Sequence, residues 1–390
     1  MRGRRLAWLL LALTACGGPA SDGPDEAAPA SGRPPDRPLL SRDAVHLEPV
    51  LRLSDPARLA QPRDLSVDDA GNVYVLDFAP PSGILKYGPE GEFQLRFGAR
   101  EEEERLVSGI EMDLTPWRTV LVIDRGRNTL NSYLIIGTFA LSVEVKPAVA
   151  LDVLGLPGFG EFYLHKWDTE GQRSVVLHMR APFDSLATTY EVRVPVASSL
   201  REEARAVHYH TAVDREGRLY VGFYDGYPVR VLEPDGRTVR LIDLDRERLR
   251  KSAEELRREE EANLARLHEQ APQMDDELVR EAARPDSLWP LLEELSVDPT
   301  GRLWVRTRRP DLGGATPYDV FNEQGDYLVR VDVPGRVERT VFAPDGRLFT
   351  IVAGEDGAWE IVGYRVGLGA PGPADDPERT AAQPTSESGT

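Results

Sequence analysis

The chain has 390 residues, of which 41% are hydrophobic, and a formal net charge of −18 at pH 7. A protein this acidic is repelled by nucleic acids and by anionic lipid head groups, which argues against a nucleic-acid partner and against membrane binding through a basic surface. Its single cysteine, Cys16, excludes an intramolecular disulfide.

The N-terminal residues have the pattern of an export signal. A basic start is followed by an apolar run from Leu6 to Leu13 and by small residues before Cys16. Since this run is too short to span a bilayer, residues 1–15 are predicted to be a secretory signal peptide. The segment Leu13-Thr14-Ala15-Cys16 resembles the lipobox of bacterial lipoproteins. The resemblance implies that Cys16 is acylated, becomes the mature N-terminus and anchors an exported protein to the cell envelope.

Two segments have the composition of unfolded chain. Residues 16–43 and 369–390 are rich in Pro, Gly, Ala, Ser and Asp. Such segments bury too little apolar surface to offset the entropy of ordering them, so we predict a flexible tether and a disordered tail. In bacterial lipoproteins, an Asp directly after the cysteine tends to retain the protein at the inner membrane. Here Gly17 follows the cysteine, so the resemblance favours the outer membrane. Residues 44–368 remain for the folded part, which we expect to be monomeric.

A short pattern recurs through the folded part: a β-rich run, the turn Asp-x-x-Gly, and a second β-rich run. It predicts a β-hairpin in which the glycine takes positive φ and the aspartate bonds the turn, so these aspartates are interpreted as structural. The six positions equivalent to the aspartate are Asp68, Thr115, Asp168, Asp214, Asp298 and Ala343. Four of the five intervals lie between 45 and 53 residues, which is the period of a four-stranded propeller blade.

The fold class expected from this period is all-β, a six-bladed β-propeller of four-stranded antiparallel blades. The last repeat is one strand short, and residues 45–54 form an unpaired strand that can complete it and close the ring. Residues 61–98 resemble the NHL repeat in their Val-Asp-x-x-Gly turn and Tyr-Val-x-Asp strand. Together with the lipobox, this makes the chain similar to the six-bladed, NHL-like propeller lipoproteins of bacteria. That resemblance indicates fold and leaves function open.

The remaining interval, of 84 residues, carries an insertion at about 245–290. It contains many Glu, Arg, Leu and Ala, and no Gly between Asp245 and Arg284. We predict one or two helices, broken near Pro272, between the first hairpins of blades 4 and 5. The insertion either lies across the propeller, or caps or shapes one mouth of its channel, or docks a partner.

The candidate ligand-binding residues follow from the repeat register. Four residues before each turn position, at the start of each innermost strand, stand Asp64, Glu111, Leu164, His210, Glu294 and Arg339. Five of these six are polar or ionisable, more than a dry core would contain. His208 lies two residues before His210 and shares its face of the strand, so the two are weak candidates for a divalent metal site. The ligand-binding set is therefore Asp64, Glu111, His208, His210, Glu294 and Arg339.

Three functions remain open. The preferred hypothesis is a binding or scaffolding module that takes a protein, peptide or small ligand at the channel mouth. The second is a metal-assisted hydrolase, lactonase or lyase that uses the His, Asp and Glu residues of the mouth. The third is a purely structural envelope protein. The chain lacks the nucleophile-elbow, Walker and dinucleotide motifs, and we assign no catalytic residues.

Overall fold

The computed structural model describes residues 38–99, 105–145, 148–168, 170–171, 173–180, 184–193, 209–270, 275–308, 314–354 and 357–369. The predicted signal peptide, Cys16, most of the tether, the tail from residue 370 and His208 lie outside these ranges. Within them, no helix has both the length and the apolar character needed to cross a membrane.

The described chain forms six four-stranded sheets, each antiparallel. Blade 1 has β2 (Pro62–Val67), β3 (Val73–Asp77), β4 (Gly83–Tyr87) and β5 (Phe93–Phe97); blade 2 has β6 (Gly109–Leu114), β7 (Thr119–Asp124), β8 (Thr129–Leu134) and β9 (Phe139–Glu144). Blade 3 has β10 (Ala148–Gly155), β11 (Glu161–Asp168), β12 (Arg173–Arg180) and β13 (Asp184–Arg193); blade 4 has β14 (Tyr209–Val213), β15 (Leu219–Phe223), β16 (Gly226–Leu232) and β17 (Thr238–Ile242). Blade 5 has β18 (Glu294–Val297), β19 (Leu303–Arg306), β20 (Ala315–Phe321) and β21 (Tyr327–Pro334); blade 6 has β22 (Arg336–Phe342), β23 (Leu348–Ala353), β24 (Trp359–Leu368) and β1 (Val45–Ser54).

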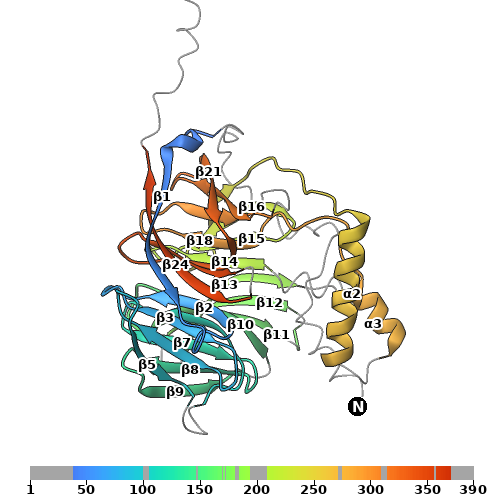
Figure 1. Ribbon diagram of the computed structural model, residues 1–390. Helices are drawn as coiled ribbons and strands as arrows, with labels where there is room; N and C mark the ends of the chain where they lie inside the picture. The colour runs from blue at the N-terminus through green and yellow to red at the C-terminus, as the bar shows by residue number, and fades with distance from the viewer. Residues whose placement is uncertain are drawn as a thin grey trace, which may run out of the picture.

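The six sheets close into a ring. The innermost strands β2, β6, β10, β14, β18 and β22 each contact the innermost strands of the two neighbouring blades, and β22 of the last blade returns to β2 of the first. On the outside, β1 pairs with β24 from Val45 opposite Leu368 to Ser54 opposite Glu360, and Figure 1 shows the blue β1 beside the red β24. The all-β, six-bladed propeller predicted from the repeat is confirmed, and so is its closure by residues 45–54.

The recurrent aspartates build the turns of the first hairpins. Oδ1 of Asp214 accepts hydrogen bonds from the backbone nitrogens of Glu216 and Arg218, at 3.0 and 2.9 Å, and the hydroxyl of Tyr220 donates to Oδ2 at 3.2 Å. The turn closes at Gly217 with φ of +82°, a conformation that side chains with a Cβ rarely adopt. Each such turn therefore joins its own strand pair through local hydrogen bonds.

Blade 3 corrects the repeat register. We expected Asp168-x-x-Gly to be its first hairpin, but β10 pairs with β11 and the Asp168 turn joins β11 to β12. Asp168 still makes the expected local bonds, because its Oδ1 accepts from the backbone nitrogens of Glu170 and Gly171. The first hairpin of this blade instead turns through residues 156–160. Leu164, placed at the channel by the wrong register, lies on β11, and Asp152 on β10 takes the channel position.

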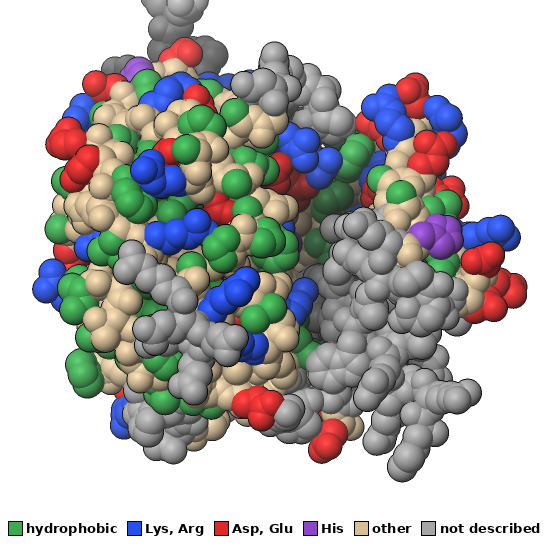
Figure 2. Space-filling model, turned by 60° about the horizontal axis from the view of Figure 1, so that its bottom comes forward, with side chains coloured by type: hydrophobic (Ala, Val, Ile, Leu, Met, Phe, Trp, Pro, Cys, Tyr) green, Lys and Arg blue, Asp and Glu red, His purple; other side chains and the backbone are tan. Residues whose placement is uncertain are grey.

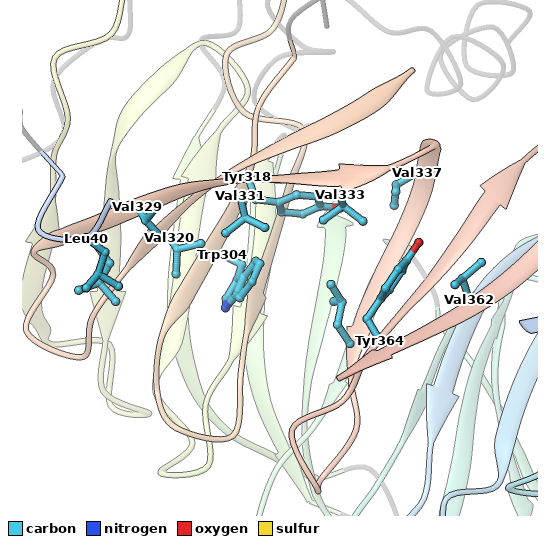
Figure 3. Packing of buried hydrophobic residues seen from close by; sticks show 12 residues of the cluster. Leu40, Trp304, Tyr318, Val320, Val329, Val331, Val333, Val337, Val362 and Tyr364 are labelled. Carbon is cyan, nitrogen blue, oxygen red and sulfur yellow. The ribbon is translucent and has the colours of Figure 1, made fainter. Parts of the chain in front are cut away.

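The core lies between neighbouring blades. Figure 3 shows one cluster, in which the fully buried Trp304 and Tyr318 of blade 5 pack with Val337 and Tyr364 of blade 6. Leu40 joins this cluster from the segment that precedes the propeller. Burial of side chains of this size stabilises the folded state by about 1.5–3 kcal/mol each.

Between β17 and β18 the chain forms two helices, α2 (Ala253–Gln270) and α3 (Asp276–Ala283). Figure 1 shows both at one side of the propeller. Asn263 on α2 donates from Nδ2 to the carbonyl oxygen of Ala283 at 3.1 Å, and Leu267, Val279 and Ala283 are fully buried. The two helices therefore pack against each other as a unit.

Candidate functional site: the channel mouth

Each innermost strand places one ionisable side chain at the same level of the channel. By the pairing register of the first hairpins these six residues, here called the ring, are Asp64, Glu111, Asp152, His210, Glu294 and Arg339. In blades 1, 2, 3 and 6 the strand register shifts just before the ring residue, as in a β-bulge. Bulges redirect side chains next to functional sites, and here they recur at one level of the channel.

Arg339 is the cation at the centre of the ring. Its Nε donates to Oδ1 of Asp64 at 2.7 Å, while Nη2 lies 3.4 Å from Oε2 of Glu111 and Nη1 lies 3.7 Å from Oε1 of Glu294. One guanidinium group thus contacts carboxylates from blades 1, 2 and 5. Burial alone would lower the pKa of Arg339, but these carboxylates more than offset burial and hold the pKa well above its usual value.

Several ring residues also bond the next blade. Oδ2 of Asp64 accepts from the backbone nitrogen of Met112 at 2.8 Å, and Oδ2 of Asp152 accepts from the hydroxyl of Thr211 at 2.6 Å. The backbone nitrogen of Thr340 donates to Oε1 of Glu294 at 3.0 Å. These bonds cross from blade 1 to 2, from 3 to 4 and from 5 to 6, so the ring fixes the blades to one another.

Two ring carboxyl groups have raised pKa values. Burial raises the pKa of Glu111 well above its usual range, and the nearby Asp64 and Asp152 raise it further against the opposing effect of Arg339. Burial also raises the pKa of Asp152, opposed mainly by Arg339 and by the hydrogen bond from Thr211. The side chain of Glu111 is nevertheless 25% exposed and that of Arg339 is 28% exposed, so solvent reaches this level of the channel.

Asp113 lies two residues beyond Glu111 on β6 and extends the polar surface. Burial raises its pKa to about 7, although the backbone nitrogens of Gly155 and Leu114 donate to its carboxylate at 2.6 and 2.8 Å. Next to the ring, Arg306 on β19 places Nη1 3.3 Å from Oε2 of Glu294. Sequence reasoning missed Asp113, Asp152 and Arg306. For Asp152 the available signal was the β-rich run 148–152 before the Gly-containing segment 156–160.

The predicted site residues therefore divide into three groups. Asp64, Glu111, Glu294 and Arg339 are brought together in one ion-pair network. His210 occupies the equivalent position on β14 and is partly exposed. His208 lies outside the described residues, so the predicted His208 and His210 pair stays a prediction. Across the described ranges no three His, Cys, Asp or Glu side chains are grouped so as to hold a metal ion.

The helical insertion follows β17, the outermost strand of blade 4, and ends beside the mouth. Its last residues lead into Glu294, and the backbone nitrogen of Leu291 donates to the carbonyl oxygen of Tyr224 at 2.8 Å. At the base of the insertion, Nη2 of Arg248 lies 2.6 Å from Oδ2 of Asp286. The backbone nitrogen of Lys251 donates to the carbonyl oxygen of Ser287 at 2.8 Å. Figure 2 shows a recess between the insertion and the propeller body in which hydrophobic, acidic and basic side chains are all seen.

Comparison with known proteins agrees on the fold. No family model matches the sequence, and a search of curated proteins found no match. Among solved structures, a candidate exported protein of Bacteroides fragilis is similar at 10% identity and a TM-score of 0.51, over 84% of this chain and 96% of that one. Virginiamycin B lyase of Staphylococcus aureus has 9% identity and a TM-score of 0.44, over 81% of this chain and 88% of that one.

A gluconolactonase of Xanthomonas campestris has 13% identity and a TM-score of 0.45, over 82% of this chain and 98% of that one. At 10% identity, the likeness to the Bacteroides fragilis protein shows a shared fold and nothing about activity. The activities of the lyase and the gluconolactonase are not transferred to this chain. The chain is thus an all-β, six-bladed propeller with an ionisable ring at its channel mouth.

Proposed function

We propose that this chain is an exported, lipid-anchored propeller that binds a ligand at its channel mouth through a cationic group of that ligand. The single observation that carries the proposal is the excess of carboxyl groups over cations in the ring. Four of the six positions carry a carboxyl group and one carries a guanidinium group. Arg339 already contacts three of these carboxylates.

Burial raises the pKa of Glu111 and of Asp152, and the neighbouring carboxylates raise both further. A carboxyl group that is held partly neutral by burial and by neighbouring carboxylates ionises more readily when a second cation approaches. An ammonium or guanidinium group at the mouth would therefore be favoured over a neutral group of the same shape. We infer that the ligand is a peptide, a protein segment or a small amine.

A matched pair of peptides tests this proposal. The probe is Gly-Gly-Arg-Gly-Gly amide, and its control contains citrulline in place of Arg, which keeps the shape and removes the charge. Titration calorimetry should detect the Arg peptide and give at least tenfold weaker binding for the citrulline peptide, since a charge-assisted hydrogen bond contributes about 1.5–3 kcal/mol.

The variants Glu111→Gln and Asp152→Asn should weaken binding of the Arg peptide. Glu338→Gln serves as the control, because Glu338 neighbours Arg339 on β22 but pairs with Arg336 and not with a ring residue. If Glu338→Gln weakens binding as much as the ring variants do, the binding reflects the overall acidity of the protein. That result would contradict a site at the mouth.

The anchor is part of the same proposal. We infer, from the lipobox resemblance, that Cys16 is acylated and that the tether holds the propeller at the cell envelope. Gly17, which follows the cysteine, favours the outer membrane. Membrane fractionation tests this: the protein should sediment with membranes, and Cys16→Ala should release it. Mass spectrometry of the mature N-terminus should show a diacylglyceryl cysteine.

A second candidate function is favoured by a separate observation. The carboxyl groups of Glu111, Asp113 and Asp152 have raised pKa values and lie at or next to a mouth that solvent reaches. Such carboxyl groups are the type of residue that performs general acid–base catalysis near neutral pH. A metal-assisted version would need His208 and His210. Elemental analysis of the purified protein, with His208→Ala and His210→Ala as variants, separates the candidates. A stoichiometric divalent metal that both variants lose would favour the hydrolase, lactonase or lyase over the binding module.

A further inference from the structure

A pocket lies away from the channel, at the outer edge of blade 5. There the segment preceding the propeller crosses β21, and the backbone nitrogens of Leu39 and Leu40 donate to the carbonyl oxygens of Tyr327 and Leu328 at 3.2 and 2.8 Å. The pocket between them has a volume of about 290 Å³. Its lining is Pro38, Leu40, Ser41, Arg42, Arg246, Tyr327, Val329 and Arg330.

The charge of this lining is opposite to that of the protein. Three of its eight residues are arginines and none is acidic, although the chain as a whole carries a net charge of −18. The nearest acidic partners stand behind the arginines: Asp332 accepts from Nε of Arg330 at 3.0 Å, and Asp319 accepts from Nη2 of Arg246 at 3.2 Å. Two carboxylates thus oppose three guanidinium groups, which leaves the pocket with a net positive charge.

Two of the arginines have buried nitrogens without a hydrogen-bond partner among the described residues. These are Nη2 of Arg330, whose side chain is only 7% exposed, and Nε of Arg246. A buried donor on a charged group that lacks an acceptor costs free energy, so such groups normally have a partner. Both nitrogens are closed to solvent as they stand, so an anion in the pocket would supply the missing acceptor after a small rotation of these side chains.

We propose that this pocket, lined by Arg42, Arg246 and Arg330, binds the phosphate or carboxylate group of a small amphiphilic molecule. The planar guanidinium group suits oxyanions because it can donate two parallel hydrogen bonds. The other wall of the pocket is apolar: Leu40 and Val329 belong to the buried cluster of Figure 3, where they lie close together. An apolar group next to the anion would pack there.

The proposal is independent of the function proposed for the mouth. The mouth is lined by the innermost strands and has excess carboxylates, whereas this pocket lies on β21, the outermost strand of blade 5. The two sites prefer ligands of opposite charge, so each can fail without the other.

The test uses the purified full chain and two probes, inorganic phosphate and phenyl phosphate, titrated by calorimetry at constant ionic strength. Saturable binding at one site is expected, and phenyl phosphate should bind more tightly because its ring would cover Leu40 and Val329. Arg42→Gln should weaken binding by at least about tenfold, which corresponds to the loss of one charge-assisted hydrogen bond. Arg42 is exposed, so this variant is expected to fold normally.

Arg330→Gln should weaken binding at least as much, and circular dichroism will show whether it remains folded; if it does not, Arg42→Gln decides alone. The matched control is Arg365→Gln, an exposed arginine of blade 6 that pairs with Glu48. Absence of saturable binding, or equal weakening by Arg365→Gln, would overturn the proposal. Competition with vesicles that contain phosphatidic acid distinguishes the sources: displacement of phenyl phosphate by the vesicles indicates a phospholipid head group, and displacement by inorganic phosphate alone indicates a soluble anion.

Discussion

Arg339 on blade 6 donates a hydrogen bond to Asp64 on blade 1, with 2.7 Å between Nε and Oδ1. These residues are 275 positions apart in the sequence and belong to the last and the first blade. The pairing of β1 with β24 completes blade 6 at its outer edge, and the Arg339 to Asp64 contact joins blade 6 to blade 1 at the channel. The same residues that form the candidate binding ring therefore also close the propeller.

We predict that Arg339→Met destabilises the protein by about 3–5 kcal/mol, because it leaves the fully buried Asp64 without its cation. Urea unfolding measures the effect. The double variant with Asp64→Asn should recover part of the loss, giving a coupling energy of about 1 kcal/mol or more. Arg365→Gln breaks an ion pair whose side chains are 67% and 63% exposed, and it should change stability by less than about 1 kcal/mol. Equal effects of the two arginine substitutions would contradict a closing role for Arg339.

The acidity of Asp113 predicts a pH-dependent stability. Its pKa is raised to about 7 in the folded protein, above the value of about 3.9 expected for the unfolded chain. The folded state therefore binds a proton more tightly, and this contribution to stability is present below about pH 4 and lost as the pH rises through about 7. The Asp113→Asn variant does not have this loss, so its free energy of unfolding should rise relative to that of the unsubstituted protein as the pH increases from about 4 to about 8. Urea unfolding across this range measures the difference, and a pH-independent difference would show that Asp113 is not buried in this way.

The propeller was predictable because its signals are local and periodic. The turn chemistry of Asp68, Asp214 and Asp298 depends on backbone nitrogens within four residues, so it can be recognised in the sequence without knowing the fold. Counting from these turns placed Asp64, His210 and Glu294 in equivalent positions on their strands.

The same locality explains the error in blade 3. Asp168 makes the same type of turn, but its hydrogen bonds do not specify which two strands the turn connects. The turn that does belong to the first hairpin, at 156–160, has no Asp-x-x-Gly, so Asp152 was missed and Leu164 was placed at the channel. The contacts of Arg339 could not be predicted either, because they depend on how six blades meet around one axis.

The closing strand offers a prediction that contrasts two residues of β1. Leu53 is buried in the cluster between blades 6 and 1, whereas Val50, at the register shift of the strand, is 38% exposed. Leu53→Ala should destabilise the protein by about 2–4 kcal/mol, because it leaves a cavity, and Val50→Ala should change stability by less than about 0.5 kcal/mol. Chemical denaturation of both variants measures this. Similar small effects would mean that β1 contributes little to closure.

Binding at the mouth should depend on pH in a defined direction. Because the pKa values of Glu111 and Asp152 are raised, part of their negative charge is missing at mildly acidic pH. The affinity for the Arg peptide should therefore rise as the pH increases from about 5 to 8, and binding should release protons. Calorimetry in two buffers of different ionisation enthalpy measures the number of protons released. Glu111→Gln should reduce both the proton release and the pH dependence, whereas Glu338→Gln should leave both unchanged. An affinity that falls with pH, or proton uptake on binding, would mean that the ligand's cation does not approach the ring carboxyls and would count against the proposed function.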